Sequence, residues 1–132
     1  MRALLLPLLL LAACTTTEPP ADTRNYLAGT NWRRIDDDLS NPHGATMAFT
    51  EEGASGETGC NRWFTSVTHN GEALRFGSIG LTRRACTGEV QQGAEQRFLQ
   101  ALEATRYAHY DQDALVLLDE NQQVIARFYR ED

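Results

Sequence analysis

Lysine is absent from the chain, and all twelve of its basic residues are arginines. They are outnumbered by eighteen acidic residues, which gives a formal net charge of −6 at pH 7. A protein that binds nucleic acid needs basic side chains gathered on one face to neutralise phosphates. Because these arginines are scattered along an acidic chain, we expect no nucleic acid partner.

Long apolar runs are also scarce. The one clear run, residues 3–11, follows Arg2 and is shorter than the roughly 20 residues that a stable membrane-spanning helix needs. It ends in two alanines followed by Cys14, a pattern typical of bacterial lipoprotein signals, in which this cysteine is lipidated. We predict that residues 1–13 are a signal peptide and that Cys14 carries the lipid. An ordinary secretory signal with an incidental cysteine is the alternative.

Residues 14–26 are rich in threonine, proline and acidic residues, so we predict a lipidated cysteine followed by a flexible tether. One domain is predicted over residues 27–130. The membrane is the expected partner through the lipid anchor, because several acyl chains on one residue hold firmly. Thr15 stands where the common inner-membrane retention signal has aspartate. We therefore expect the outer membrane, facing the periplasm, in a host with two membranes, and we expect a monomer.

Cysteines are also few, and only Cys60 and Cys86 remain once Cys14 is lipidated. In an oxidising compartment a disulfide is their expected state. It would close a loop of about 25 residues and contribute on the order of 3 kcal/mol. Two buried free thiols and a metal site are the alternatives. Neither cysteine has another cysteine or a histidine at ligand spacing, so we predict no metal site and no cofactor.

Sequence motifs of catalysis are missing as well. Residues 53–56 come nearest to a Gly-x-Ser-x-Gly elbow but have the wrong spacing, and no His-Glu-x-x-His occurs. The three histidines, His43, His69 and His109, lie far apart in the sequence. Paired carboxylates fall in predicted turns or at the C-terminus, where solvated charge is the ordinary interpretation. We therefore predict no catalytic residue.

What the sequence does contain is one helical pattern among many short strand-like segments. Apolar residues spaced by three and four predict a helix over residues 89–105, with one face made of Val90, Ala94, Phe98, Ala101 and Leu102. Alternating and β-branched segments predict strands over residues 27–35, 45–50, 55–58, 62–68, 73–76, 106–110, 114–118 and 123–129.

The predicted strand over residues 62–68 has Trp63 on one face and Phe64 on the other, so its inward face is left open. The Asn70-Gly71 pair that follows predicts a tight hairpin turn, because both residues tolerate positive φ. Seven or eight short strands with one late helix predict a mainly β fold of the α+β class. We expect a small antiparallel, barrel-like β-sheet packed with one α-helix.

Three motifs in this order carry a resemblance to a known family: Gly59-Cys60-Asn61, then Thr82-Arg83-x-x-Cys86, then the helical Glu95-x-x-Phe98-Leu99-x-x-Leu102. Together with the two closing strands they resemble the META domain, also called HslJ-like. The resemblance implies a small barrel-like β-structure capped by a helix, in an envelope protein. It also marks Asn61, Thr82 and Arg83 as signature polar residues, and both Cys60 and Cys86 match cysteine positions of the family. Arg84 departs from the family, which usually has methionine there.

Two classes of function follow from these observations. The first is a non-catalytic envelope lipoprotein that binds or supports an envelope protein, a lipid or a stressed envelope component. The resemblance favours it and adds stress or antibiotic tolerance. The alternative is an enzyme or inhibitor with a site that no motif signals, which carboxylates or histidines converging in a pocket with shifted pKa would indicate. Asn61 and Arg83 could serve such a site, but satisfying loop backbone groups is the favoured interpretation.

Overall fold

The computed structural model describes residues 13–15, 26–39, 44–84, 86 and 88–131. The predicted signal peptide and most of the predicted tether therefore lie outside the described residues. The described chain contains one helix and nine strands: β1 (Asn31–Arg34), β2 (Thr46–Phe49), β3 (Gly53–Glu57), β4 (Arg62–Asn70), β5 (Ala73–Phe76), β6 (Gly80–Leu81), α1 (Glu89–Ala104), β7 (Tyr107–Asp111), β8 (Ala114–Leu118) and β9 (Val124–Glu131). No helix in this described part is long and apolar enough to cross a membrane.

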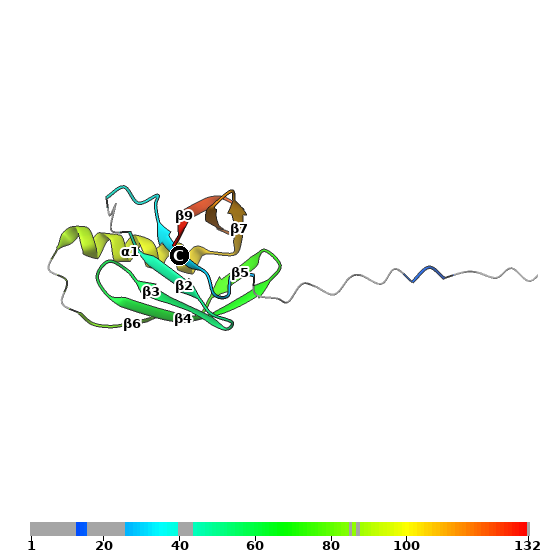
Figure 1. Ribbon diagram of the computed structural model, residues 1–132, viewed down its shortest axis with the longest axis horizontal. Helices are drawn as coiled ribbons and strands as arrows, with labels where there is room; N and C mark the ends of the chain where they lie inside the picture. Colours follow the sequence, from blue (N-terminus) through cyan, green and yellow to red (C-terminus); the bar gives the residue numbers. More distant parts are fainter. Residues whose placement is uncertain (1–12, 16–25, 40–43, 85, 87, 132) are drawn as a thin grey trace, which may run out of the picture.

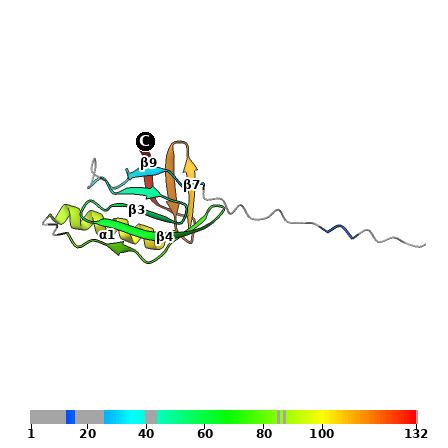
Figure 2. The ribbon, with the colours of Figure 1, turned by 60° about the horizontal axis from the view of Figure 1, so that its bottom comes forward.

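The strands form one antiparallel sheet in the order β3-β2-β1-β9-β8-β7-β5-β4-β6. A further pairing between β3 and β4 closes this sheet into a ring. β6 lies beside the first half of β4, and β5 lies beside its second half. Figures 1 and 2 show β6 and the start of α1 at one end of the domain and β7 toward the other. The predicted fold, a small antiparallel barrel-like sheet with one helix, is confirmed.

Aromatic side chains from the ring and the helix meet in the core. Trp63, Phe98 and Phe128 are fully buried. The ring of Phe98 lies 5.2 Å from that of Trp63 and 6.3 Å from that of Phe128, both in edge-on geometry. Apolar burial contributes roughly 25 cal/mol per Å², and aromatic contacts of this kind add to it. Phe98 therefore stabilises the packing of α1 against β4 and β9.

The predicted apolar face of the helix is confirmed at Ala94, Phe98, Ala101 and Leu102, which are all buried. Its fifth predicted member, Val90, is 58% exposed, because burial along α1 begins only at Ala94, one turn later. Sequence spacing shows which residues share a face but not how far along the helix the sheet covers it.

The structure settles which face of β4 points inward. Trp63, Thr65 and Val67 are buried, whereas Phe64 points outward and is 56% exposed. Phe64 pairs directly with Gly80 of β6, and a Cβ atom on Gly80 would lie only 2.4 Å from the Phe64 ring. An aromatic ring over a cross-strand glycine at a sheet edge is a known stabilising arrangement. This contact explains why both faces of the strand carry an aromatic residue.

Several predicted boundaries were wrong. The first strand was predicted over residues 27–35, but residues 26–29 form a turn with Gly29 at φ +80°. The third strand was predicted over residues 55–58 but runs from Gly53 to Glu57, and the two-residue strand β6 was not predicted. These strands depend on partners distant in sequence, so local pattern did not define their ends.

The hairpin between β4 and β5 is confirmed, but the centre of its turn lies one residue later than predicted. Asn70 pairs with Ala73, so Gly71 and Glu72 form the two-residue loop. Gly71 has φ +58°, and a positive φ at the first loop position is the property for which type II′ turns select glycine.

Candidate functional site

The side chain of Asn61 is buried at the turn between β3 and β4, where it contacts two distant segments. Its Nδ2 donates to Oε2 of Glu95 on α1 over 2.9 Å. Its Oδ1 accepts from the backbone N–H of Arg84 over 2.7 Å and from the Thr82 hydroxyl over 3.4 Å. Asn61 thus joins the turn, the helix and the segment after β6, as expected for a residue that satisfies loop groups.

Thr58 completes this arrangement and was not singled out in the sequence. Its hydroxyl is fully buried, donates to Oε2 of Glu95 over 2.6 Å and accepts from the backbone N–H groups of Cys60 and Asn61. We call Thr58, Asn61, Thr82 and Glu95 the junction. The helical motif contained Glu95, but only the fold shows that its carboxylate receives both Thr58 and Asn61.

The structure joins Cys60 and Cys86 in a disulfide beside the junction, with Cα atoms 5.6 Å apart. Arg83, the other signature residue considered for a site, is exposed, and the described hydrogen bonds do not join it to Asn61. The backbone of Arg84 takes that place. Cys14, the predicted lipidation site, is a free, exposed cysteine.

A pocket opens at the end of the ring where β1 begins, β9 ends and β7 turns into β8. It has a volume of about 400 Å³ and is lined by Trp32, Tyr110, Gln112, Asp113, Tyr129 and Arg130. We call it the mouth pocket. Strand register explains its composition, because Trp32 pairs with Arg130 and the β7–β8 turn lies next to the end of β9.

Trp32 forms the buried floor of the mouth pocket, where it is 1% exposed. Its Nε1 donates to the Thr30 hydroxyl over 2.7 Å. The Tyr110 ring lies 5.6 Å from Trp32 and 5.7 Å from Tyr26. The guanidinium carbon of Arg130 lies 5.9 Å from the centre of the Trp32 ring, within range of a cation–π interaction.

Two phenols near the mouth are held in their neutral form. Burial, with smaller contributions from Tyr110 and Glu72, raises the pKa of Tyr26 to about 12, and its hydroxyl donates to the carbonyl of Ala108 over 2.9 Å. Burial also raises the pKa of Tyr110, although the positive charge of Arg130 opposes the shift. The phenol of Tyr110 is therefore neutral at physiological pH.

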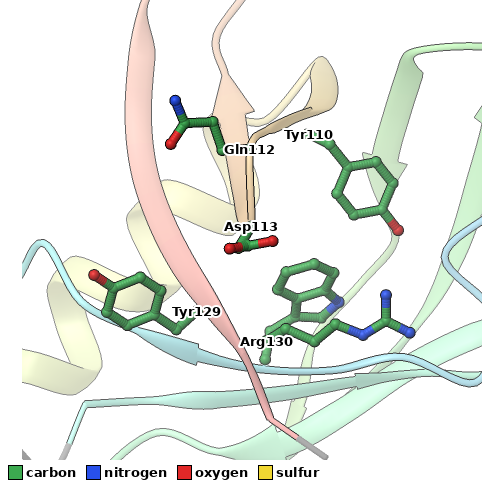
Figure 3. A pocket seen from close by; sticks show the side chains of 6 residues that line it. Tyr110, Gln112, Asp113, Tyr129 and Arg130 are labelled. Atoms are coloured by element: carbon green, nitrogen blue, oxygen red, sulfur yellow. The ribbon is translucent and has the colours of Figure 1, made fainter.

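Figure 3 shows Asp113 at the centre of the pocket, with Tyr129 on one side of β9 and Tyr110 and Arg130 on the other. Gln112 lies above it at the β7–β8 turn, with a backbone φ of +56°. A second hollow of about 400 Å³ shares Gln112, Asp113 and Tyr129 with the mouth pocket. It continues past the ion pair between Arg127 and Asp111, whose atoms are 3.0 Å apart. The two hollows therefore share a rim made by the β7–β8 turn and Tyr129.

The two described histidines, His69 and His109, are not among the residues that line either hollow. His109 lines a cavity of about 450 Å³ near Glu72 and Tyr107, and His69 lines one of about 200 Å³ near Arg75 and Arg106. His43 lies outside the described residues. Within the described ranges, no group of three or more histidine, cysteine or carboxylate side chains is placed to hold a metal ion.

The mouth pocket was missed at the sequence level. Its residues are separated by up to about one hundred positions, and each one alone resembles an ordinary turn or surface residue. Trp32, Tyr110 and Tyr129 fell in three different predicted strands, and no local signal linked them.

Comparison with known proteins places these features in a family context. Residues 25–132 match the family model of the META domain. A protein from Burkholderia xenovorans, solved by NMR, has 24% sequence identity and a TM-score of 0.62, with 88% of this chain and 94% of that chain covered. A DUF4847 family protein from Bacteroides vulgatus has 14% identity and a TM-score of 0.61, with 81% and 97% covered. At these identities the two structures share the fold. A search of curated protein sequences finds no match.

Proposed function

Because the chain belongs to the META domain family, we propose that it is a non-catalytic bacterial envelope lipoprotein whose domain binds an envelope component. In this proposal the component occupies the mouth pocket, and binding contributes to tolerance of envelope stress or antibiotics. The family supports the envelope setting, and the pocket supports the binding role.

The observation that carries the binding role is the composition of the mouth pocket. Tyr110 and Tyr129 offer exposed aromatic surface, while Gln112, Asp113 and Arg130 offer hydrogen-bond donors and acceptors. A concave site with aromatic surface and a few convergent polar groups is the usual form of a small-ligand site, and barrel mouths are one of its common locations. The junction around Asn61, in contrast, satisfies its own groups internally.

The proposed anchor is Cys14. Eleven residues, 15–25, separate it from Tyr26. Fully extended, a segment of that length reaches at most about 40 Å. Tyr26, at the end of this segment, contacts Tyr110 of the mouth pocket. With Cys14 lipidated, as proposed, the pocket would lie at the anchored end of the domain, within reach of membrane components.

Mass spectrometry of the membrane fraction tests the anchor. We expect a mature chain that begins at a diacylated or triacylated Cys14. An intact N-terminus, or an unmodified Cys14 in the mature chain, would refute the lipoprotein part of the proposal.

Photo-crosslinking in the native envelope tests the binding role. A photoreactive residue at position 112 should give a discrete adduct, while the same residue at exposed position 100 on α1 should not. The matched pair controls for collisions in a crowded compartment. Identical adduct patterns at both positions would contradict a site at the mouth.

A further inference from the structure

We propose that the mouth pocket binds a β-linked pyranose chain, the kind of saccharide found in cell-wall glycan. The inference names the ligand class for the binding role proposed above and rests on that role. A pyranose whose substituents are equatorial has two apolar C–H faces and a rim of hydroxyl groups. The pocket offers a matching surface for both parts.

The aromatic part of the match comes from Tyr110 and Tyr129. Their exposed fractions are 42% and 58%, and Figure 3 shows them on opposite sides of β9. The ring of Tyr110 is held by Trp32 at 5.6 Å and by Tyr26 at 5.7 Å. A tyrosine held in this way offers a large contact area with little further loss of conformational entropy when a ligand stacks on it.

The polar part of the match comes from three side chains of different hydrogen-bonding type. Asp113 accepts, Arg130 donates, and the Gln112 amide does both. Arg130 is steadied by its position over the Trp32 ring. The negative charge of Asp113 disfavours a phosphate, and the positive charge of Arg130 disfavours a cation. Hydroxyl groups both donate and accept, so a neutral polyol suits this set best.

Gln112 is the first residue of the two-residue loop between β7 and β8, because Asp111 pairs with Ala114. Its φ of +56° lies in the left-handed region, which non-glycine residues adopt at a cost in stability. The first position of such a hairpin loop requires a positive φ, so the turn itself accounts for this conformation. A glycine would fit this turn better, but it would remove the amide from the pocket rim.

The second hollow indicates a chain of sugars rather than one. It shares Gln112, Asp113 and Tyr129 with the mouth pocket and adds the ion pair of Asp111 and Arg127. A ligand that crosses the end of β9 would place one ring against Tyr110 and the next against Tyr129.

Isothermal titration of the lipidated full-length mature protein with N-acetylchitotetraose tests the proposal. The detergent must lack sugar head groups, so that it does not compete. We expect saturable one-site binding, and at least tenfold weaker binding of α-linked maltotetraose. Cosedimentation with purified cell-wall glycan distinguishes a polymeric source from free oligosaccharide.

Variants localise the site. Tyr110→Leu and Tyr129→Leu should each weaken binding about tenfold, which corresponds to the upper range for an aromatic contact. Tyr110→Phe and Tyr129→Phe, which keep the rings, should bind within about threefold of the native protein. Phe64→Leu changes an exposed aromatic residue away from the mouth and should leave binding unchanged. Thermal unfolding of every variant separates lost binding from lost folding.

Gln112→Gly keeps the test decisive if a tyrosine variant fails to fold. It relieves the positive φ and should raise the melting temperature while weakening saccharide binding at least threefold. Failure of the tetrasaccharide to bind the native protein overturns the ligand class, as does unchanged binding in Gln112→Gly. A lipidated protein that forms the adduct at position 112 but binds no saccharide would retain the proposed function and lose only this inference.

Discussion

Both ends of the Asn61 amide are engaged in the structure, one by Glu95 and the other by Arg84 and Thr82. Removing it would leave the partly buried carboxylate of Glu95 with one donor fewer and the backbone N–H of Arg84 without its acceptor. Such groups are expensive to leave unsatisfied away from water. At the residue scale, the two signature residues Asn61 and Arg83 therefore differ in burial and in hydrogen-bond partners.

Asn61→Ala should lower the free energy of unfolding by about 2–3 kcal/mol, because Glu95 and the backbone N–H of Arg84 each lose a hydrogen bond in a partly buried site. Arg83→Ala should change it by less than about 0.5 kcal/mol, since the side chain is exposed. Urea denaturation of the two variants measures both values. Equal losses would mean that Arg83 supports the fold through a contact the structure does not contain.

Tyr26 predicts a pH dependence of stability. Its pKa is raised from 10.0 to about 12 in the folded protein, so the unfolded chain releases the phenolic proton first. The stabilisation is complete below pH 10 and is lost as pH rises toward 12. Native protein should therefore lose stability relative to Tyr26→Phe across that window, as denaturant midpoints can show.

Tyr129→Phe is the matched control for this measurement, since Tyr129 is 58% exposed. Its stability curve should run parallel to that of the native protein. Below pH 10, Tyr26→Phe should be less stable by about 1 kcal/mol through the lost bond to Ala108. Parallel curves for the native protein and Tyr26→Phe at high pH would contradict the cause given for the shift.

At the scale of the elements, α1 depends on the ring for its stability. A helix of 16 residues is marginal in water on its own, and Gly93 lies within it. The packing of four buried residues on one face of α1 supplies the stability that the isolated helix lacks. The disulfide and the junction hold its beginning, and Phe98 holds its middle.

Phe98→Ala should lower the free energy of unfolding by about 3–5 kcal/mol, from lost transfer energy and the cavity left behind. Gln100→Ala, on the exposed side of α1, should be nearly neutral. Thermal and chemical denaturation of both variants provide the comparison. Similar losses would refute the helix orientation, and a large loss for Val90→Ala would show that the first turn is covered after all.

The disulfide connects β4 to the segment that enters α1, across a sequence separation of 26. Cys60→Ser and Cys86→Ser should each cost about 2–5 kcal/mol. The double variant should cost little more than either single one, because all three lack the same bond. Thiol labelling of unreduced, denatured protein is the direct measurement, and two reactive thiols at positions 60 and 86 would contradict the bond.

At the scale of the whole molecule, anchoring and folding are separate properties. Cys14 is exposed and free in the structure, whereas Cys60 and Cys86 are paired inside the domain. The ring and α1 form one core, and that core contains no residue before Leu27 among the described residues. Loss of the proposed lipid anchor should therefore leave the folded domain unchanged.

Cys14→Ser should remove the protein from the membrane fraction and leave the melting temperature of the domain unchanged. Fractionation and differential scanning calorimetry of the same preparation give both results. Cys60→Ser is the reciprocal control, with membrane attachment retained and the melting temperature lowered. A Cys14→Ser variant that stays in the membrane fraction with unchanged extraction behaviour would argue against the lipid as the anchor.

Local patterns in the chain were enough to predict the short-range features of the domain. The three- and four-residue spacing around Phe98 predicted α1 to within one residue at its end, because burial against a sheet selects a single helical face. Alternation and turn residues likewise predicted the last hairpin, where β8 pairs with β9. The lipid on Cys14 follows from a contiguous motif and stays a prediction.

Closure of the sheet into a ring determined the features that local patterns did not predict. It selected the inward face of β4, placed Arg84 rather than Arg83 beside Asn61, and brought Trp32, Tyr110 and Arg130 to one opening. None of these relations has a local signature, because each depends on which strands pair and in which register. The fold class was therefore predictable from short-range periodicity, whereas the candidate site arises only from pairing between residues far apart in the sequence.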